Sequence, residues 1–220
     1  MKKLSSHLKF YLRLILLMVV SVSGMSCAAL PYTTQAPSRP APVFVACSVA
    51  QQAGLEQALS DADGLALNAY QVLSGMPESQ RASSTRYQEW FGSYAPANYA
   101  VVTANYQHIS AAFASQTITF TCGCPELLFA FVNPGQPYQI TLCASFWNAP
   151  ETGTNSRAGT LVHEMSHFTV VAGTVDHVYS QVFSRANARY IPAKAIQNAD
   201  SYRYFAENDP QLEPRMPALQ

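Results

Sequence analysis

The sequence predicts an α+β fold that is mainly helical and contains a small antiparallel sheet. Apolar residues recur every three or four positions before residue 113 and after residue 157, and they alternate with polar residues in between. The 220 residues are 49% hydrophobic and 12% charged, which suffices for one domain with a substantial core. A formal net charge of zero leaves no basic surplus, so we expect no nucleic-acid partner.

Residues 1–28 have the organisation of a secretory signal peptide. Basic residues precede a short apolar run, 14–22, and small residues follow it. The run is shorter than the ~20 residues that span a bilayer, which disfavours a retained membrane anchor. We expect cleavage before Ala29; the alternative is a lipoprotein with lipidated Cys27, although Gly24 suits a lipobox poorly. The protein is therefore expected to be secreted, and to associate with membranes only if Cys27 is lipidated.

Four cysteines remain beyond the signal, and an even number in an exported chain indicates two disulfides. Cys122 and Cys124 are too close in sequence for a relaxed bridge, so each is expected to pair elsewhere. Two connectivities remain open: Cys47 with Cys122 and Cys124 with Cys143, or Cys47 with Cys124 and Cys122 with Cys143. A zinc cluster of the four cysteines is a weaker alternative, because a better metal motif lies downstream.

The elements follow from local patterns, beginning with a linker over 29–43 that is rich in Pro, Thr and Ser. The folded domain is expected over 44–210, followed by an irregular tail over 211–220. Helical spacing and breaker residues predict helices over 48–75, 83–92, 96–113, 157–171, 177–190 and 193–207. Alternation and a continuous apolar run predict three antiparallel strands over 117–122, 127–132 and 138–143.

The clearest chemical motif is His-Glu-x-x-His, formed by His163, Glu164 and His167. Residues four apart share one face of a helix, so both imidazoles can bind one metal ion. Glu164 lies beside the ion without binding it and is positioned to act as a general base towards metal-activated water. The rest of the helix is apolar, and unpaired polar groups are costly to bury there. The motif therefore predicts one zinc ion per chain.

A catalytic zinc site needs a third protein ligand and an open fourth position. Asp176 and His177 lie nine and ten residues beyond His167, after a glycine that can end the helix. Spacing alone does not choose between these two side chains.

Beyond the motif, the chain resembles the aspzincins, the family of deuterolysins and peptidyl-lysine metalloendopeptidases. In that family the helix is followed by Gly-Thr-x-Asp, which matches 173–176, so the resemblance selects Asp176 as the third ligand and leaves His177 as a surface or neighbouring residue. Tyr179 matches a tyrosine that stabilises the oxyanion. Position 180 departs from the family pattern, because it is Ser where Gly is usual.

The resemblance spans roughly 45–210 and is strongest to the peptidyl-lysine branch. It implies a zincin-like metalloprotease domain and the disulfides Cys47–Cys122 and Cys124–Cys143. The matching segments are Thr85-Arg86-Tyr87, Trp90-Phe91-Gly92, 146–150, 152–154, Asn198-Ala199-Asp200 and 204–208.

The resemblance also implies cleavage on the amino side of lysine. In the lysine-specific relatives a pocket aspartate, supported by a glutamate three residues later, receives the substrate ammonium group in the S1′ subsite. Asp200 matches the aspartate, but position 203 is Arg. Arg203 either pairs with Asp200 and weakens its attraction for lysine, or points into solvent.

The expected function is that of a secreted zinc endopeptidase that acts on proteins or peptides as a monomer. The substrate is expected to lie along the edge strand of the sheet. The rival interpretation is a secreted, zinc-stabilised binding or toxin module without turnover, and a second rival is a cell-wall amidase. Glu164 together with Tyr179 favours the enzyme, since a structural zinc needs neither.

Overall fold

The computed structural model of the chain describes residues 39–212. The predicted signal peptide, Cys27, most of the predicted linker and residues 213–220 of the predicted tail lie outside the described residues. None of the helices within 39–212 combines the length and apolar character that crossing a bilayer requires.

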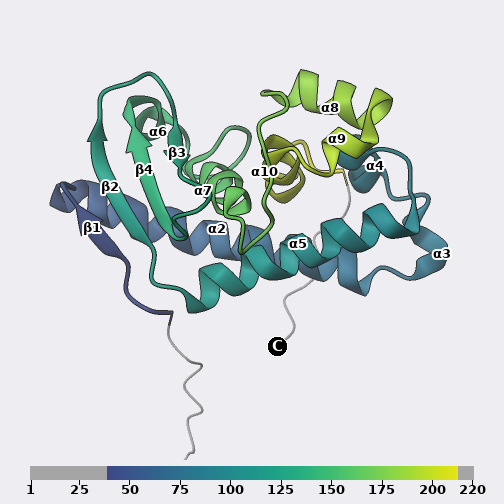
Figure 1. Cartoon of the computed structure of the whole chain (residues 1–220), viewed down its shortest axis with the longest axis horizontal. Helices are drawn as coiled ribbons and strands as arrows, with labels where there is room; N and C mark the ends of the chain where they lie inside the picture. The colour runs from purple at the N-terminus through teal and green to yellow at the C-terminus, as the bar shows by residue number, and fades with distance from the viewer. Residues whose placement is uncertain (1–38, 213–220) are drawn as a thin grey trace, which may run out of the picture. The chain divides into compact units, whose positions relative to one another are not determined.

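Two long helices, α2 (Val49–Gly75) and α5 (Pro96–Ser115), pack against each other and underlie the rest of the domain (Figure 1). Helix α2 begins at a capping box in which the side chains of Ser48 and Gln51 each bond the other residue's backbone N–H. Its buried stripe contains many small side chains, which let α5 and α7 (Arg157–His167) approach closely: Leu55, Ala58, Leu59, Ala62, Ala66, Ala69, Val72 and Leu73.

The remaining helices are shorter: α3 (Glu78–Arg81), α4 (Thr85–Phe91), α6 (Ala144–Asn148), α8 (Gln181–Tyr190), α9 (Pro192–Ala195) and α10 (Ala199–Glu207). The three predicted N-terminal helices are confirmed within a few residues. Three later boundaries were wrong. Helix α7 ends at His167, α8 begins only at Gln181, and the predicted helix 193–207 is divided into α9 and α10. Tertiary contacts of the intervening segments, described below, override the helical periodicity.

A four-stranded sheet in the order β1-β2-β4-β3 flanks the helices. Its strands are β1 (Val43–Val45), β2 (Thr119–Cys124), β3 (Ala130–Val132) and β4 (Gln139–Cys143). The prediction of an α+β, mainly helical fold is confirmed, but the antiparallel pairing was wrong except for β3 with β4. Strand β4 pairs with β2 in parallel, β1 pairs with β2 in parallel, and β1 and β3 form the two edges. Alternation shows which segments are extended but not their spatial order.

The structure contains the disulfides Cys47–Cys122 and Cys124–Cys143. They confirm the pairing implied by the family resemblance and exclude the alternative zinc cluster. Strand β2 is irregular between Thr121 and Cys124, and Gly123 adopts a φ of 103° there. This irregularity allows Cys122 and Cys124 to bond different partners, one beyond β1 and the other on β4.

Aromatic side chains and one buried cation connect the N-terminal helices to α10. Phe91 of α4 and Tyr106 of α5 both contact Tyr202 and Phe205 with ring centroids 5.1–5.4 Å apart. The fully buried Arg86 donates hydrogen bonds from Nε and Nη2 to the carbonyl oxygen of Phe205. These contacts hold α10 beside α7, where the metal motif lies.

Candidate metal centre

Several side-chain hydrogen bonds fix the N-terminus of α7, the helix that carries the metal motif. Ser156 accepts a hydrogen bond from the Gly159 N–H, and the Glu207 carboxylate accepts from the backbone N–H groups of Asn155 and Ser156. A Cβ atom at position 159 would collide with this carboxylate. The close approach of α10 therefore requires Gly159 and fixes the start of α7.

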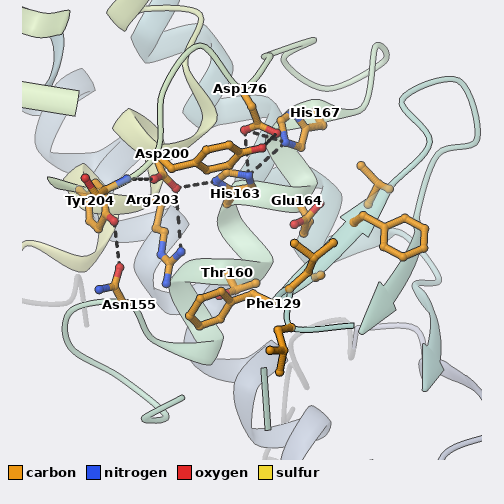
Figure 2. A pocket seen from close by; sticks show the side chains of 17 residues that line it. Phe129, Asn155, Thr160, His163, Glu164, His167, Asp176, Asp200, Arg203 and Tyr204 are labelled. Atoms are coloured by element: carbon orange, nitrogen blue, oxygen red, sulfur yellow. Dashed lines mark hydrogen bonds and ion pairs between the residues drawn. The ribbon is translucent and has the colours of Figure 1, made fainter. Parts of the chain in front are cut away.

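The two motif histidines lie one turn apart on the buried face of α7, as predicted. Their Nε2 atoms are 3.1 Å apart, and both rings are largely buried. Figure 2 shows both rings turned toward Asp176.

The chain reverses after His167 and returns along α7. The carbonyl oxygen of Phe168 accepts from three successive backbone N–H groups, and Gly173 then adopts a φ of 59°. The Thr174 N–H donates to the carbonyl oxygen of Ser166, and Val175 forms a parallel bridge with Asn198. These contacts end α7 at His167 rather than at the predicted residue 171, and they place Asp176 beside the two histidines.

Spacing left Asp176 and His177 open and the family resemblance selected Asp176; the structure likewise places Asp176 beside the imidazoles. Its Oδ1 atom lies 3.2 Å from Nε2 of His163 and 3.4 Å from Nε2 of His167. The ring of His177 does not join this group of potential ligands among the described residues.

Hydrogen bonding on the far side of each ring assigns the tautomers. Nδ1 of His167 lies 2.9 Å from the carbonyl oxygen of Thr174, and Nδ1 of His163 lies 2.9 Å from Oδ1 of Asp200. Both partners accept, so both Nδ1 atoms carry protons, and each ring presents its Nε2 atom to Asp176, as a lone pair once the second ring proton is displaced. Two ring nitrogens and a carboxylate oxygen thus converge on one point, which either a shared proton or a metal cation must occupy.

The spacing of these atoms fits zinc. Two ligands bound at about 2.0–2.1 Å in a tetrahedral arrangement are about 3.3–3.4 Å apart. The three observed separations are 3.1, 3.2 and 3.4 Å. Two nitrogens and one carboxylate oxygen are also ligands that zinc prefers, and they leave a fourth position open.

The local potential at this centre is strongly negative. Burial disfavours the charged form of His163, but hydrogen bonds to Asp176 and Asp200 prevail and raise the pKa of His163 to about 10. Burial would raise the pKa of the Asp176 carboxyl, yet the two imidazoles hold it well below its usual range. An anionic carboxylate facing the two rings favours binding of a divalent cation.

Glu164 and Tyr179 line the same cavity as the three ligand atoms, which has a volume of about 570 Å³. Glu164 is almost fully buried, and burial raises its carboxyl pKa while the two imidazoles act in the opposite direction. The Tyr179 hydroxyl donates to Oδ2 of Asp176 over 2.8 Å, and its ring stacks on His163. Both residues therefore lie within reach of a group bound at the metal.

Asp200 and Arg203 also line this cavity, but Asp200 bonds protein groups there, whereas the family resemblance implied that it receives a substrate ammonium group. Asp200 is buried behind His163, where Oδ1 bonds the ring and Oδ2 accepts from the Ser180 N–H over 2.8 Å. Arg203 is buried with Nη1 3.9 Å from Asp200, so the pairing alternative holds and the solvent alternative was wrong. Sequence reasoning gave Glu207 no role, although its buried carboxylate organises the start of α7.

Comparison with known proteins agrees with this geometry. Residues 77–207 match the aspzincin family, described as lysine-specific metallo-endopeptidase. The chain belongs to the aspzincin family of metalloendopeptidases. A peptidyl-Lys metalloendopeptidase of Pleurotus ostreatus is 47% identical over 170 residues, which cover 77% of this chain and 98% of that protein. The recognition of the family from sequence is thereby confirmed, as is its assignment as a zinc metalloendopeptidase.

Two further relatives of this aspzincin differ in length. An extracellular protease of Aeromonas hydrophila is 44% identical over 164 residues, which cover 74% of this chain but only 46% of that protein. The solved zinc peptidase from Grifola frondosa superposes with a TM-score of 0.72 at 38% identity, covering 76% of this chain and all of that chain. The described domain thus corresponds to the whole of one solved peptidase and to about half of a longer relative.

Proposed function

We propose that His163, His167 and Asp176 bind one zinc ion and that Glu164 and Tyr179 complete the site for hydrolysis of internal peptide bonds. The observation that carries this proposal is the convergence of two imidazole nitrogens and one carboxylate oxygen, 3.1–3.4 Å apart, in a cavity that also contains a buried carboxylate. Zinc, when bound, acts as a Lewis acid on the scissile carbonyl and lowers the pKa of water.

Glu164 acts as the general base and then the general acid. It accepts a proton from the attacking water and returns it to the leaving amine. Burial supports this role, because a carboxylate with a raised pKa releases and takes up a proton more readily near neutral pH.

Tyr179 stabilises the negative charge that develops on the carbonyl oxygen. Burial and the neighbouring Asp176 carboxylate raise the pKa of its phenol above the usual value, so the hydroxyl remains a hydrogen-bond donor. Its side chain is 61% exposed, which leaves it free to turn from Asp176 toward a bound substrate.

The substrate backbone lies along β3 as an added strand. Strand β3 occupies one edge of the sheet, packs against α7 and lines the cavity of the metal ligands. Its outer edge offers backbone groups to an extended peptide, which would pass directly over the metal ligands.

The protein is proposed to act outside the cell as a monomer. The signal-like N-terminus supports export, and a relative is named an extracellular protease. The preference for lysine at P1′, the residue after the scissile bond, stays a prediction. The relatives named peptidyl-Lys metalloendopeptidases favour it, whereas the pairing of Arg203 with Asp200 weakens the proposed ammonium site.

Substitution of Glu164 by Gln tests the proposal. The variant should retain zinc, measured by metal analysis, and lose hydrolysis of casein, because the amide cannot accept the water proton. Glu56→Gln, at an exposed position of α2, is the matched control and should match wild type. Absence of hydrolysis by the zinc-loaded wild type would instead favour the binding-module alternative.

A further inference from the structure

Arg203 is a buried guanidinium in the wall of the cavity that contains the metal ligands. Its side chain is 7% exposed and lines this cavity together with the ligand residues. Figure 2 shows its guanidinium group on the side of His163 away from His167. We call this part of the cavity the arginine recess; it is lined by Phe129, Asn155, Thr160, Asp200, Arg203 and Tyr204.

The guanidinium group of Arg203 is fixed by protein contacts, but one of its N–H donor atoms has no hydrogen-bond partner among residues 39–212. Its Nε atom bonds Oε1 of Glu207 at 3.3 Å, and its Nη1 atom lies 3.9 Å from Asp200. The rings of Phe129 and Tyr204 lie 5.2 and 5.6 Å from its Cζ atom. Among residues 39–212, Nη2 has no hydrogen-bond partner although it is buried. A buried donor is therefore left unpaired on a side chain that lines the cavity of the metal ligands.

The acidic side chains near Arg203 are already committed to other partners. Asp200 accepts from His163 through Oδ1 and from the Ser180 N–H through Oδ2. The Glu207 carboxylate is bonded to Asn155 and Ser156 and does not line the cavity. A substrate side chain in the recess therefore meets the unpaired donor of Arg203 rather than a free carboxylate.

We infer that the arginine recess is the S1′ subsite and that Arg203 selects a P1′ side chain ending in an oxygen acceptor, such as Gln or Glu, over lysine. This inference rests on the proposed endopeptidase function of the same site. An amide or carboxylate oxygen pairs with Nη2 and removes the unsatisfied buried donor. A lysine offers three donors and no acceptor, leaves Nη2 unpaired and brings a second positive charge to the guanidinium.

A set of four peptides that differ only at P1′ tests this inference on the wild-type protein. Gln, Glu, Met and Lys all have long unbranched side chains, so they differ mainly in the terminal group. We expect kcat/KM for Gln and Glu to exceed that for Met by about tenfold or more, because an unpaired buried donor penalises substrates without an acceptor. Lysine should be cleaved least efficiently. Cleavage of the Lys peptide as fast as or faster than Gln and Glu would overturn the inference.

Arg203→Met tests the same point from the protein side. It should abolish the preference for Gln over the Met peptide, whereas Arg189→Met, at an exposed position of α8, should preserve the wild-type ratio. Peptide binding by zinc-loaded Glu164→Gln, measured by calorimetry, provides a readout without turnover if Arg203→Met does not fold. Tighter binding of the Gln than of the Lys peptide supports the inference, and the reverse order rejects it.

The outcomes also separate this inference from the proposed function. Cleavage of all four peptides with no preference, or with preference for Lys, rejects the role of Arg203 and leaves the endopeptidase intact. Absence of cleavage of any peptide and of casein rejects both.

Discussion

Helices α7 and α10 lie side by side and are both buried over almost their whole length. Their buried polar side chains differ in what they contact. Helix α7 directs Nε2 of His163 and Nε2 of His167 at one carboxylate oxygen of Asp176, and the three atoms enclose a position for a cation. Helix α10 buries Asp200, Arg203 and Glu207, which bond one another or α7.

The difference shows two ways in which a protein can bury polar groups. Ligand atoms that enclose a position for a cation, like those of α7, are expected to serve function. Charges that are compensated by protein partners, like the carboxylates of Asp200 and Glu207 on α10, are expected to support stability and orientation. Substitutions of the metal-binding residues in α7 should therefore abolish activity, whereas substitutions of Asp200 or Glu207 in α10 should weaken folding or metal affinity.

The largest effect should come from the α7 ligands. His167→Ala removes one of three protein ligands, and we expect zinc content to fall to near zero and hydrolysis to background. His177→Ala is the matched control, because that ring is not part of the ligand group. Metal analysis and a casein assay on both variants check this, and retained zinc in His167→Ala would contradict the assigned centre.

Glu207→Ala should produce the largest loss of stability in α10. It leaves the Arg203 guanidinium without its Nε partner and two backbone N–H groups at the start of α7 without an acceptor. Removal of one member of a buried ion pair costs about 3–5 kcal/mol of unfolding free energy. Urea unfolding measures this change. Glu56→Ala, at an exposed position, should stay within about 0.5 kcal/mol of wild type, and equal effects would contradict the distinction.

Asp200→Asn tests the link between the two helices, because Asp200 lies on α10 and its carboxylate orients His163 of α7. An amide has one acceptor oxygen, so it cannot accept from both His163 and the Ser180 N–H. We expect zinc affinity to fall about 10–100-fold, as is usual when the partner of a metal-binding histidine is altered. Competition with a chelator measures this affinity. An unchanged affinity would leave Asp200 without an orienting role.

The smallest effect concerns the segment between the two helices. Ser180 adopts a φ of 75° and a ψ of 156°, a conformation that favours glycine. Ser180→Gly should stabilise the protein by about 1 kcal/mol and raise Tm by about 2–4 °C. Ser180→Ala, which retains a Cβ atom, should give no such gain in thermal unfolding; a gain with Ala would show that backbone strain is not the cause.

Local patterns predicted much of the fold and the centre of the site. Helical periodicity predicted α2, α4 and α5 closely, and the i, i+4 spacing of His163 and His167 predicted their convergence. The pairing order of the strands was not predictable, because alternation carries no information on neighbours. The end of α7 at His167 was missed because the bridge between Val175 and Asn198 overrides an otherwise helical pattern.

The sequence by itself determined the metal-binding face of α7, because residues four apart meet on any α-helix whatever surrounds it. Only the tertiary structure brought Asp176 to the two imidazoles, placed Asp200 behind His163 and left one donor of Arg203 unpaired. These outcomes depend on contacts between segments far apart in the chain, and no local periodicity encodes such distances.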